Sequence, residues 1–219
     1  MLFNTKVTSY TVPAEDVDAE GSEALVAYCA RISSGRPKST WGEDYEGLLK
    51  YCVRNSHWSV FEMVDATVEI EGPRDILRQI LRHRSFSFQE FSQRYSDDIK
   101  FTTRGARLQD AKNRQNSFDD MRQQDKNEFI RDCESLIYEA QRLYKYWVSQ
   151  GVAKECARVF LPEGLTMSTM QMKGSLRSWL HYLAVRDDEG VTQLEHVLIA
   201  RAIRDVLVPH FPTILGLKT

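Results

Sequence analysis

The chain has 219 residues, of which 42% are hydrophobic and 27% are charged, and its formal net charge is -2. This composition is typical of a soluble globular protein that is long enough to bury a core. The slight acidity argues against a dedicated nucleic-acid-binding protein, which usually carries a clear basic excess. No apolar stretch is long enough to cross a bilayer, and the N-terminus does not resemble a signal peptide, so we expect a cytoplasmic protein without a membrane partner.

Hydrophobic spacing in the first half of the chain predicts strands mixed with helices. Val64, Ala66, Val68 and Ile70 alternate with polar residues, which is the period of a half-buried strand. Elsewhere apolar residues recur at helical spacing. We expect a strand over 7–12, a helix over 22–30 capped by Ser22, a Gly/Pro/Ser loop over 33–40, a helix over 45–53, the strand over 61–70, ended by Gly72-Pro73, and a helix over 76–83 with Pro73 at its first position.

The second half is predicted to be mostly helical, after a polar segment over 98–126 that resembles a long loop. Asp125 followed by Glu128, and Thr192 followed by Glu195, resemble the starts of helices. Together the elements indicate an α+β fold rather than regular βαβ units. We expect a long helix up to Gly151, a helix from about 153 that stops before Pro162, a strand over 165–172, a helix that begins at Ser175, and a last helix that ends at Val208.

The cysteines do not predict a metal or redox site. Cys29, Cys52, Cys133 and Cys156 are widely separated and form no CxxC pair. Small buried hydrophobic side chains in a reducing compartment explain them better. The sequence also contains no P-loop, no GxGxxG and no HExxH spacing, so we expect no metal.

One polar and aromatic stretch, RHRSFSFQEFSQRYSD over 82–97, follows the helix over 76–83. Arg78, Gln79 and Arg82 share one side of that helix, opposite its aliphatic face. Guanidinium groups bind phosphate through two hydrogen bonds and stack on flat rings. Residue types alone leave two equal alternatives: a site for a phosphate-bearing heterocyclic ligand, or a solvated helix end with aromatic residues packed under a loop.

Basic residues also gather near the C-terminus. Arg177 and His181 are four apart on one predicted helix, and Arg186 ends it. Arginine at a helix C-terminus complements the helix dipole, and Arg177 with His181 fits an ordinary exposed pair. His57, just before the strand, is more often a structural residue than a catalytic one. These residue types alone favour the structural interpretations.

The spacing within this stretch is more specific than its residue types. Arg82, His83 and Arg84 are followed at set distances by Ser87, Ser92 and Arg94. This pattern resembles the signature of the flavin-dependent thymidylate synthases. Segments similar to that family continue in the same order over most of the chain: LVAYCARIS, SHWSVFE, ARVFLP and LRSWLHYLAVRD.

The resemblance implies a single domain over 1–219 with a small antiparallel sheet packed against several long helices. It implies that dUMP is converted to dTMP, with 5,10-methylenetetrahydrofolate as carbon donor and NADPH as reductant of a bound FAD. The family uses no cysteine nucleophile, and it assembles as a homotetramer with active sites at subunit junctions. We therefore expect the same cofactor, co-substrates and assembly here, and no nucleic-acid partner.

The resemblance also assigns residues to two ligand sites. Arg186 matches the arginine that favours the N3-ionised pyrimidine, and we expect it to be catalytic because a fixed cation stabilises negative charge on the ring. The positions that match the dUMP site are Gln79, Arg82, Glu90, Ser92, Gln93, Arg94, Arg158 and Arg186. The positions assigned to FAD are His57, Ser59, Arg82, His83, Arg84, Glu90, Ser175, Arg177 and His181.

The chain departs from the family at several of the FAD positions. Ser175 and His181 stand where many members have asparagine, and Met63 stands where many have a histidine. Phe86, Phe88, Phe91 and Tyr95 are expected to pack beneath the loop. The competing hypotheses are a non-catalytic nucleotide or RNA-binding protein that uses the aromatic and basic stretch for stacking, and a structural helical assembly whose arginines make only interface pairs.

Overall fold

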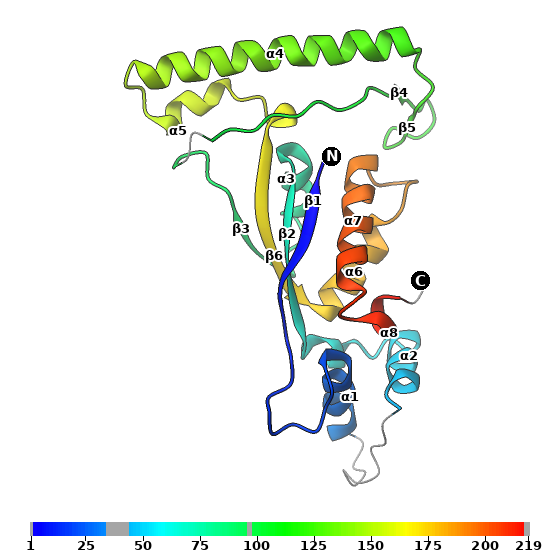
Figure 1. The fold of residues 1–219 in the computed structure, drawn as a ribbon. Coiled ribbons are helices and arrows are strands. Elements are labelled where there is room, and N and C mark those ends of the chain that lie inside the picture. The colour runs from blue at the N-terminus through cyan, green and yellow to red at the C-terminus, as the bar shows by residue number, and fades with distance from the viewer. Residues whose placement is uncertain (1, 34–43, 96–97, 217–219) are drawn as a thin grey trace.

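A four-stranded antiparallel sheet forms the centre of the computed structural model, which describes residues 2–33, 44–95 and 98–216 (Figure 1). The strand order is β1-β2-β6-β3. The expected α+β class, with a small antiparallel sheet and several helices, is confirmed. The strands are β1 (Asn4–Tyr10), β2 (Asp65–Pro73), β3 (Ser87–Glu90) and β6 (Met167–Ser175).

The strand β2 confirms the alternation seen in the sequence. Val64, Ala66, Val68 and Ile70 are all buried, while the residues between them are partly exposed. The expected break at Gly72-Pro73 is wrong, because both residues continue the pairing with β6. Proline lacks an amide hydrogen and is therefore tolerated at a strand end. Pro73 precedes the helix α3 (Arg74–Ile80) instead of occupying its first position.

Two helices cover one face of the sheet, α6 (Leu176–Arg186) and α7 (Leu194–Leu207) (Figure 1). Trp179 and Tyr182 of α6 are fully buried, as are Ile199 and Ile203 of α7. Their burial with the sheet residues supplies the apolar area that drives folding. The helices α1 (Ser22–Ile32), α2 (Glu46–Arg54) and α8 (Pro212–Leu215) adjoin this core, together with the 3-10 helix η2 (Trp58–Glu62).

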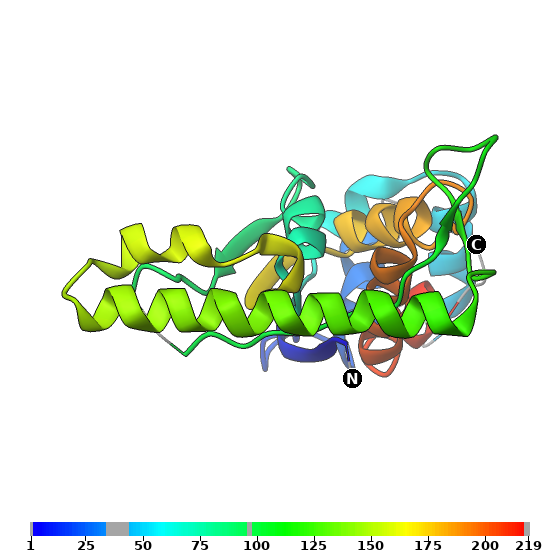
Figure 2. The ribbon, with the colours of Figure 1, turned by 90° about the horizontal axis from the view of Figure 1, so that it is seen from above.

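The long helix α4 (Gln123–Ser149) crosses the opposite end of the molecule (Figures 1 and 2). The expected helix over this region is confirmed, but its start at Asp125 is wrong. Arg122 precedes the first turn, and Asp125 pairs with Arg122 through two hydrogen bonds instead of capping the helix. Gly151, with a φ of 84°, turns the chain after α4 as expected. The short elements α5 (Lys154–Ala157), η3 (Arg158–Phe160) and η4 (Glu163–Leu165) follow.

The polar segment before α4 is more ordered than a simple loop. It contains a small hairpin formed by β4 (Leu108–Gln109) and β5 (Ser117–Phe118), and Phe101 bridges to Thr166 next to the sheet. Two paired residues on each strand are too few to produce a recognisable hydrophobic pattern. The segment's local order therefore depends on contacts that the spacing of its residues does not reveal.

The stretch after α3 contains the edge strand β3, which the sequence did not predict. Phe86 is buried and Phe88 packs against the core, as expected. Tyr95 is 76% exposed, so its expected role in packing is wrong. The stretch leaves the sheet after Glu90, and Tyr95 therefore lies beyond the strands and helices that could cover its ring.

Two expected helix caps are also wrong. Ser22 is the first residue of α1 rather than its cap, and its hydroxyl donates to the carbonyl of Thr11 at 2.7 Å. Thr192 donates to the carbonyl of Val185, while Glu195 pairs with Arg107. Side chains that fit a local cap thus satisfy distant partners here.

The helix expected to begin at Ser175 starts one residue later, at Leu176, and Ser175 caps it, since its hydroxyl accepts from the backbone amide of Ser178. Most of the loop expected over 33–40 lies outside the described residues. None of the helices in the described ranges is long and apolar enough to cross a membrane.

Gly174→Ala is predicted to destabilise the fold. A Cβ atom at this position would lie 2.5 Å from Cδ1 of Phe86, whose ring also packs edge-on against Trp179 at 4.7 Å. We expect a loss of about 1–3 kcal/mol in the free energy of unfolding, measured with urea. Gly47→Ala is the matched control, because no atom lies within 4 Å of its added Cβ and alanine favours the helix. Equal unfolding midpoints for the Gly174 variant and the parent would contradict the prediction.

Candidate functional site

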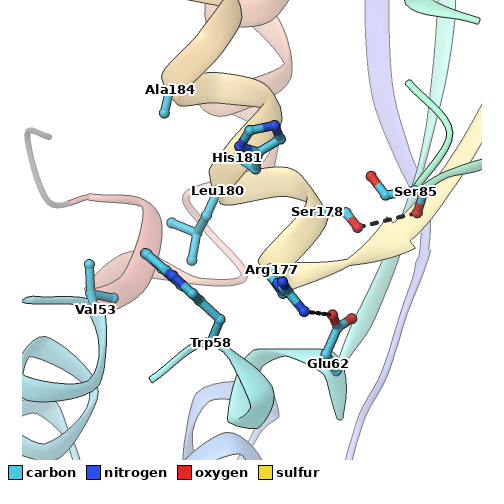
Figure 3. Close-up of a pocket in the computed structure, with 9 residues that line it drawn as sticks. All are labelled: Val53, Trp58, Glu62, Ser85, Arg177, Ser178, Leu180, His181 and Ala184. Carbon is cyan, nitrogen blue, oxygen red and sulfur yellow. Dashed lines mark hydrogen bonds and ion pairs between the residues drawn. The ribbon is translucent and has the colours of Figure 1, made fainter. Parts of the chain in front are cut away.

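A cavity of about 530 Å³ lies between α6, α2 and η2 (Figure 3). Trp58 and Leu180 supply apolar surface, and Arg177 and His181 lie one turn apart on the same side of α6. The other lining residues are Val53, Glu62, Ser85, Ser178 and Ala184. Flat apolar surface beside a cation suits a ligand that combines a ring system with an anionic group.

Glu62 organises one wall of this cavity. Its carboxylate accepts from the hydroxyl of Ser175 at 2.6 Å and from the guanidinium of Arg177 at 2.8 Å (Figure 3). The hydrogen bond from Ser175 and those from Arg177 hold the pKa of Glu62 below its usual value, although partial burial opposes this. The carboxylate therefore stays ionised and holds the Arg177 side chain at the cavity wall.

A second cavity of about 600 Å³ shares Trp58 and Arg177 with the first. His57 and Ser59 line it together with residues of α1 and α2. Five of the positions assigned to FAD thus cluster here: His57, Ser59, Ser175 (through Glu62), Arg177 and His181. The donor groups and the flat indole ring fit the pyrophosphate and rings of a flavin dinucleotide in chemical type.

Arg186 meets His83 although 103 positions separate them. Its Nε atom donates to Nε2 of His83 at 2.8 Å. Burial, with smaller contributions from Arg186 and His181, lowers the pKa of His83 to about 4. His83 is therefore neutral at physiological pH and accepts the hydrogen bond, so Arg186 keeps its full positive charge.

Two buried side chains support this pair from behind. Tyr182 packs edge-on against His83, with ring centres 4.9 Å apart. Its hydroxyl lies 3.1 Å from Nε2 of His196, a histidine with no exposed surface. Burial, followed by electrostatic interaction with Arg186 and then with His83 when it is protonated, lowers the pKa of His196 to about 3. Burial has the opposite effect on the phenol of Tyr182, whose pKa it raises, so that this side chain also stays neutral.

Gln79 extends this group toward α7. Its Nε2 atom donates to Oε1 of Gln193 at 2.8 Å, and its Oε1 atom lies 3.3 Å from Nδ1 of His196. Gln193 in turn donates to Glu195 at 2.9 Å. The structure therefore brings together Gln79, His83 and Arg186, three of the predicted site residues, from two distant parts of the sequence.

Glu90 belongs to a separate cluster at the end of β3. It accepts from the hydroxyl of Ser168 at 3.0 Å, and Arg74 and Arg78 lie 3.8 and 3.9 Å from its oxygens. Arg74 is 8% exposed, and its Nη1 atom lacks a hydrogen-bond partner. A partly buried carboxylate that faces two guanidinium groups and a hydroxyl is well compensated, so Glu90 is firmly placed.

The remaining predicted nucleotide residues lie beyond β3. Arg94 is 3.5 Å from Glu155 of α5, and the exposed Arg158 begins η3 just after α5. Gln93 is buried, and its Nε2 atom has no hydrogen-bond partner among the described residues, while Ser92 accepts from the backbone amide of Arg94. Arg82 and Arg84 are exposed and line neither of the two cavities.

Apart from Arg82 and Arg84, the predicted residues thus fall into three groups within one chain: the cavity group around Arg177, the pair of His83 with Arg186 beside Gln79, and the group from Glu90 to Arg158. Five residues of these surroundings were not predicted as site residues: Arg107, Tyr182, Gln193, Glu195 and His196. Their partners lie far away in the sequence, and Glu195 was assigned to a cap instead. Glu62 lies in the family-like segment SHWSVFE, but the sequence assigned it no role of its own. Within the described residues, no group of three or more acidic, histidine or cysteine side chains could hold a metal ion.

Comparisons with known proteins show which family and which fold this chain resembles. The family model described as thymidylate synthase complementing protein matches residues 16–213. A flavin-dependent thymidylate synthase of Synechocystis is 46% identical over 214 residues, and a probable one of Paramecium bursaria Chlorella virus 1 is 41% identical over 213 residues; each alignment covers 97% of both chains. The fold also resembles that of a UMP/dUMP methylase from Streptomyces cacaoi, with a TM-score of 0.81, 22% identity and coverage of 98% of this chain and 93% of that one.

The family model and these two relatives define the class of enzyme, a thymidylate synthase that depends on a flavin. The chain belongs to the flavin-dependent thymidylate synthase family, as 46% identity over nearly its whole length shows. The expected resemblance and the expected enzyme class are therefore confirmed, and the hypotheses of a non-catalytic binding protein and a structural assembly lose their support.

Lowering the pH from about 7 to about 5 is predicted to reduce the free energy of unfolding through His196. The unfolded histidine takes up a proton in this range, whereas the folded one, with a pKa of about 3, does not. Because the unfolded state binds more protons, the free energy of unfolding decreases as the pH is lowered, by up to about 1.4 kcal/mol per pH unit for one histidine. Urea unfolding at several pH values would measure the slope.

His196→Gln removes this titration, so its slope should be smaller than that of the parent. His57→Gln removes an exposed histidine and leaves His196 in place, and it is the matched control. An unchanged slope in His196→Gln would show that another group governs the dependence.

Proposed function

We propose that this enzyme converts dUMP to dTMP, with 5,10-methylenetetrahydrofolate as carbon donor and NADPH as the source of reducing equivalents through FAD. The relatives' names and the neighbour with a bound 5-Br dUMP support the nucleotide and the flavin. The observation that carries the proposal is the cationic Arg186 held by a neutral His83. We also propose that residues 1–219 form one catalytic domain.

The two cavities that share Trp58 and Arg177 are proposed to hold FAD. Bound there and reduced by NADPH, the flavin would supply the hydride that reduces the transferred carbon to a methyl group. Trp58 and Leu180 would pack against its rings, and Arg177, kept in place by Glu62, would neutralise its phosphates. The other assigned contacts, Arg82, Arg84 and Glu90, would reach the cofactor or nucleotide from the neighbouring edge.

Arg186 is proposed to activate the pyrimidine. Within the described residues it forms no ion pair with a carboxylate, and its hydrogen-bond partner His83 is neutral, so its charge remains available to a ligand. A fixed cation beside the uracil ring stabilises negative charge there, which makes C5 more nucleophilic toward the carbon donor. Arg186 would thus act electrostatically, without taking a proton.

The group from Ser92 to Arg158 is proposed to bind the nucleotide phosphate. Arg94 and Arg158 are both exposed, and Ser92 offers a hydroxyl. Since Arg94 is engaged with Glu155 at the α5 end, it belongs to a different part of the chain's surface from the pair of Arg186 with His83. Such separation is explained if the active site combines residues of more than one subunit.

We therefore propose a homotetramer, with part of its interface on α4. Phe129, Leu136 and Trp147 share one side of this helix at helical spacing and are 44%, 52% and 39% exposed. A helix that exposes apolar residues in this pattern usually packs against another surface. The four cysteines are free, which fits the proposed cytoplasmic location.

Arg186→Ala is predicted to keep FAD but to lose catalysis. Without the cation, kcat for dTMP formation should fall by about 100-fold or more. Turnover would be followed by dTMP formation with NADPH and the folate donor, and bound flavin by its visible spectrum. Arg131→Ala, an exposed arginine on α4, is the matched control. A normal rate in the Arg186 variant would show that it does not activate the pyrimidine, and parent protein that neither binds FAD nor makes dTMP would refute the proposed function.

Leu136→Glu is predicted to break the proposed interface. A charge within an apolar contact opposes association because the carboxylate would lose its water. Analytical ultracentrifugation should show a smaller species than the parent. Tyr138→Glu alters another exposed apolar residue on the other side of α4 and should keep the assembly. An unchanged assembly in the Leu136 variant would place the interface elsewhere.

A further inference from the structure

A continuous row of hydrogen bonds runs through the interior between α6, α3 and α7. It joins Tyr182 to His196 at 3.1 Å, His196 to Gln79 at 3.3 Å, Gln79 to Gln193 at 2.8 Å and Gln193 to Glu195 at 2.9 Å. Tyr182, His196 and Glu195 are buried, while both glutamines are partly exposed. We call these five side chains the relay. Four of them have no role in the proposed reaction.

Glu195 ends the relay as an ionised carboxylate. Burial would raise its pKa, but hydrogen bonds, chiefly those from Arg107, outweigh this and lower it. Arg107 donates through Nη1 and Nη2 to the two carboxylate oxygens, at 2.7 and 3.0 Å. Its Nε atom also donates to Ser117 of β5. Arg107 therefore fixes the charge and the position of the carboxylate at the same time.

An ionised carboxylate only accepts hydrogen bonds, and this sets the direction of every other member. Gln193 must turn its amide nitrogen to Glu195 and its oxygen to Gln79. Gln79 must then donate from its nitrogen to Gln193 and turn its own oxygen to His196. The placement of both amide groups thus follows from the charge at the end of the row.

The same logic assigns the protons at the other end. His196 must carry its proton on Nδ1 to donate to Gln79, and the unprotonated Nε2 accepts from the hydroxyl of Tyr182. The lowered pKa of His196 keeps its imidazole neutral, so with the proton on Nδ1 the Nε2 atom can only accept. The relay therefore has a single direction, from the phenol to the carboxylate.

We propose that Glu195 is a positioning residue that acts through Gln193 to orient the amide of Gln79 toward the nucleotide. The amide nitrogen of Gln79 has two hydrogens, and only one is used by Gln193. The other is left for an acceptor oxygen, such as a carbonyl or hydroxyl oxygen of a pyrimidine nucleotide. This inference rests on the proposed function, in which Gln79 contacts dUMP.

The site would therefore prefer a ligand that places a hydrogen-bond acceptor next to the amide nitrogen of Gln79. If the hydrogen bonds of the relay were reversed, the amide of Gln79 would be flipped, with its oxygen toward Gln193 and its nitrogen toward His196. The ligand would then meet a different arrangement of donor and acceptor. A glutamine at position 195 could donate as well as accept, so the orientation of the Gln193 and Gln79 amide groups would no longer be fixed. The Glu195 carboxylate would thus govern nucleotide binding without touching the nucleotide.

Glu195→Gln tests the proposal in the full-length protein. We expect dUMP to bind roughly tenfold more weakly, which corresponds to about 1.4 kcal/mol, while FAD binding is unchanged. Isothermal titration would measure dUMP affinity, and visible absorbance would measure FAD. Glu139→Gln, which alters an exposed glutamate paired with Arg142, is the matched control. It should leave both affinities unchanged.

A second variant separates orientation from loss of the buried ion pair. Gln193→Met interrupts the relay and leaves Glu195 paired with Arg107, so it should weaken dUMP binding to a similar extent. Combining either change with Gln79→Ala should cause no further weakening beyond Gln79→Ala alone, because the effect passes through that amide. Additive losses, or normal dUMP affinity in Gln193→Met, would overturn the proposal.

Nitrogen NMR of the imidazoles tests the direction of the relay without any ligand. The chain has five histidines, and the signals of His196 are identified by their loss in His196→Gln. The parent should show the neutral form protonated at Nδ1, and Glu195→Gln should show a mixture. A parent His196 protonated at Nε2 would overturn the proposal even if dUMP binds. Correct NMR signals in a protein that does not bind dUMP would instead refute the proposed function.

Discussion

Pairing between β2 and β6 determines where the functional groups of this enzyme lie. The two strands pair along their whole length, from Asp65 opposite Ser175 to Pro73 opposite Met167. Because they are antiparallel, α3 begins at one end of this ladder and α6 begins at the other. The two helices therefore run toward each other, and the residues near their C-terminal ends, His83 and Arg186, meet. A shift in the strand register would separate them.

The sequence predicted the strands and helices that have a repeating hydrophobic pattern. Its predictions were wrong where a side chain bonds to a residue that is distant in the sequence. Alternating residues revealed β2, and a long helical stripe revealed α4. The caps at Ser22 and Glu195 failed because the first bonds to Thr11 and the second to Arg107, contacts that no local spacing contains. The short strands β3, β4 and β5 were missed for a related reason, since two to four residues carry too little periodicity.

In the candidate site, too, local spacing was informative and contacts between distant residues were not predicted. The spacing from Arg82 to Arg94 was specific enough to indicate the family, although residue types alone left a binding site and a solvated helix end equally supported. No spacing indicated that Gln79 lies against His196, which is 117 positions away. Motifs therefore indicated the side chains that are proposed to face ligands, whereas the groups that contact and orient those side chains became visible only in the folded chain.

The β2 and β6 ladder also has a consequence for how the protein folds. Glu69 and Gln171, which join across it, are 102 positions apart, so pairing these strands closes a long loop that contains β3 and α4. Proteins dominated by such distant contacts fold slowly because the entropy of loop closure is lost before many contacts form. Newly made chains would remain unable to assemble His83 with Arg186 until Met167–Ser175 has left the ribosome. The contact between His83 and Arg186 is thus one of the last features that can form during synthesis.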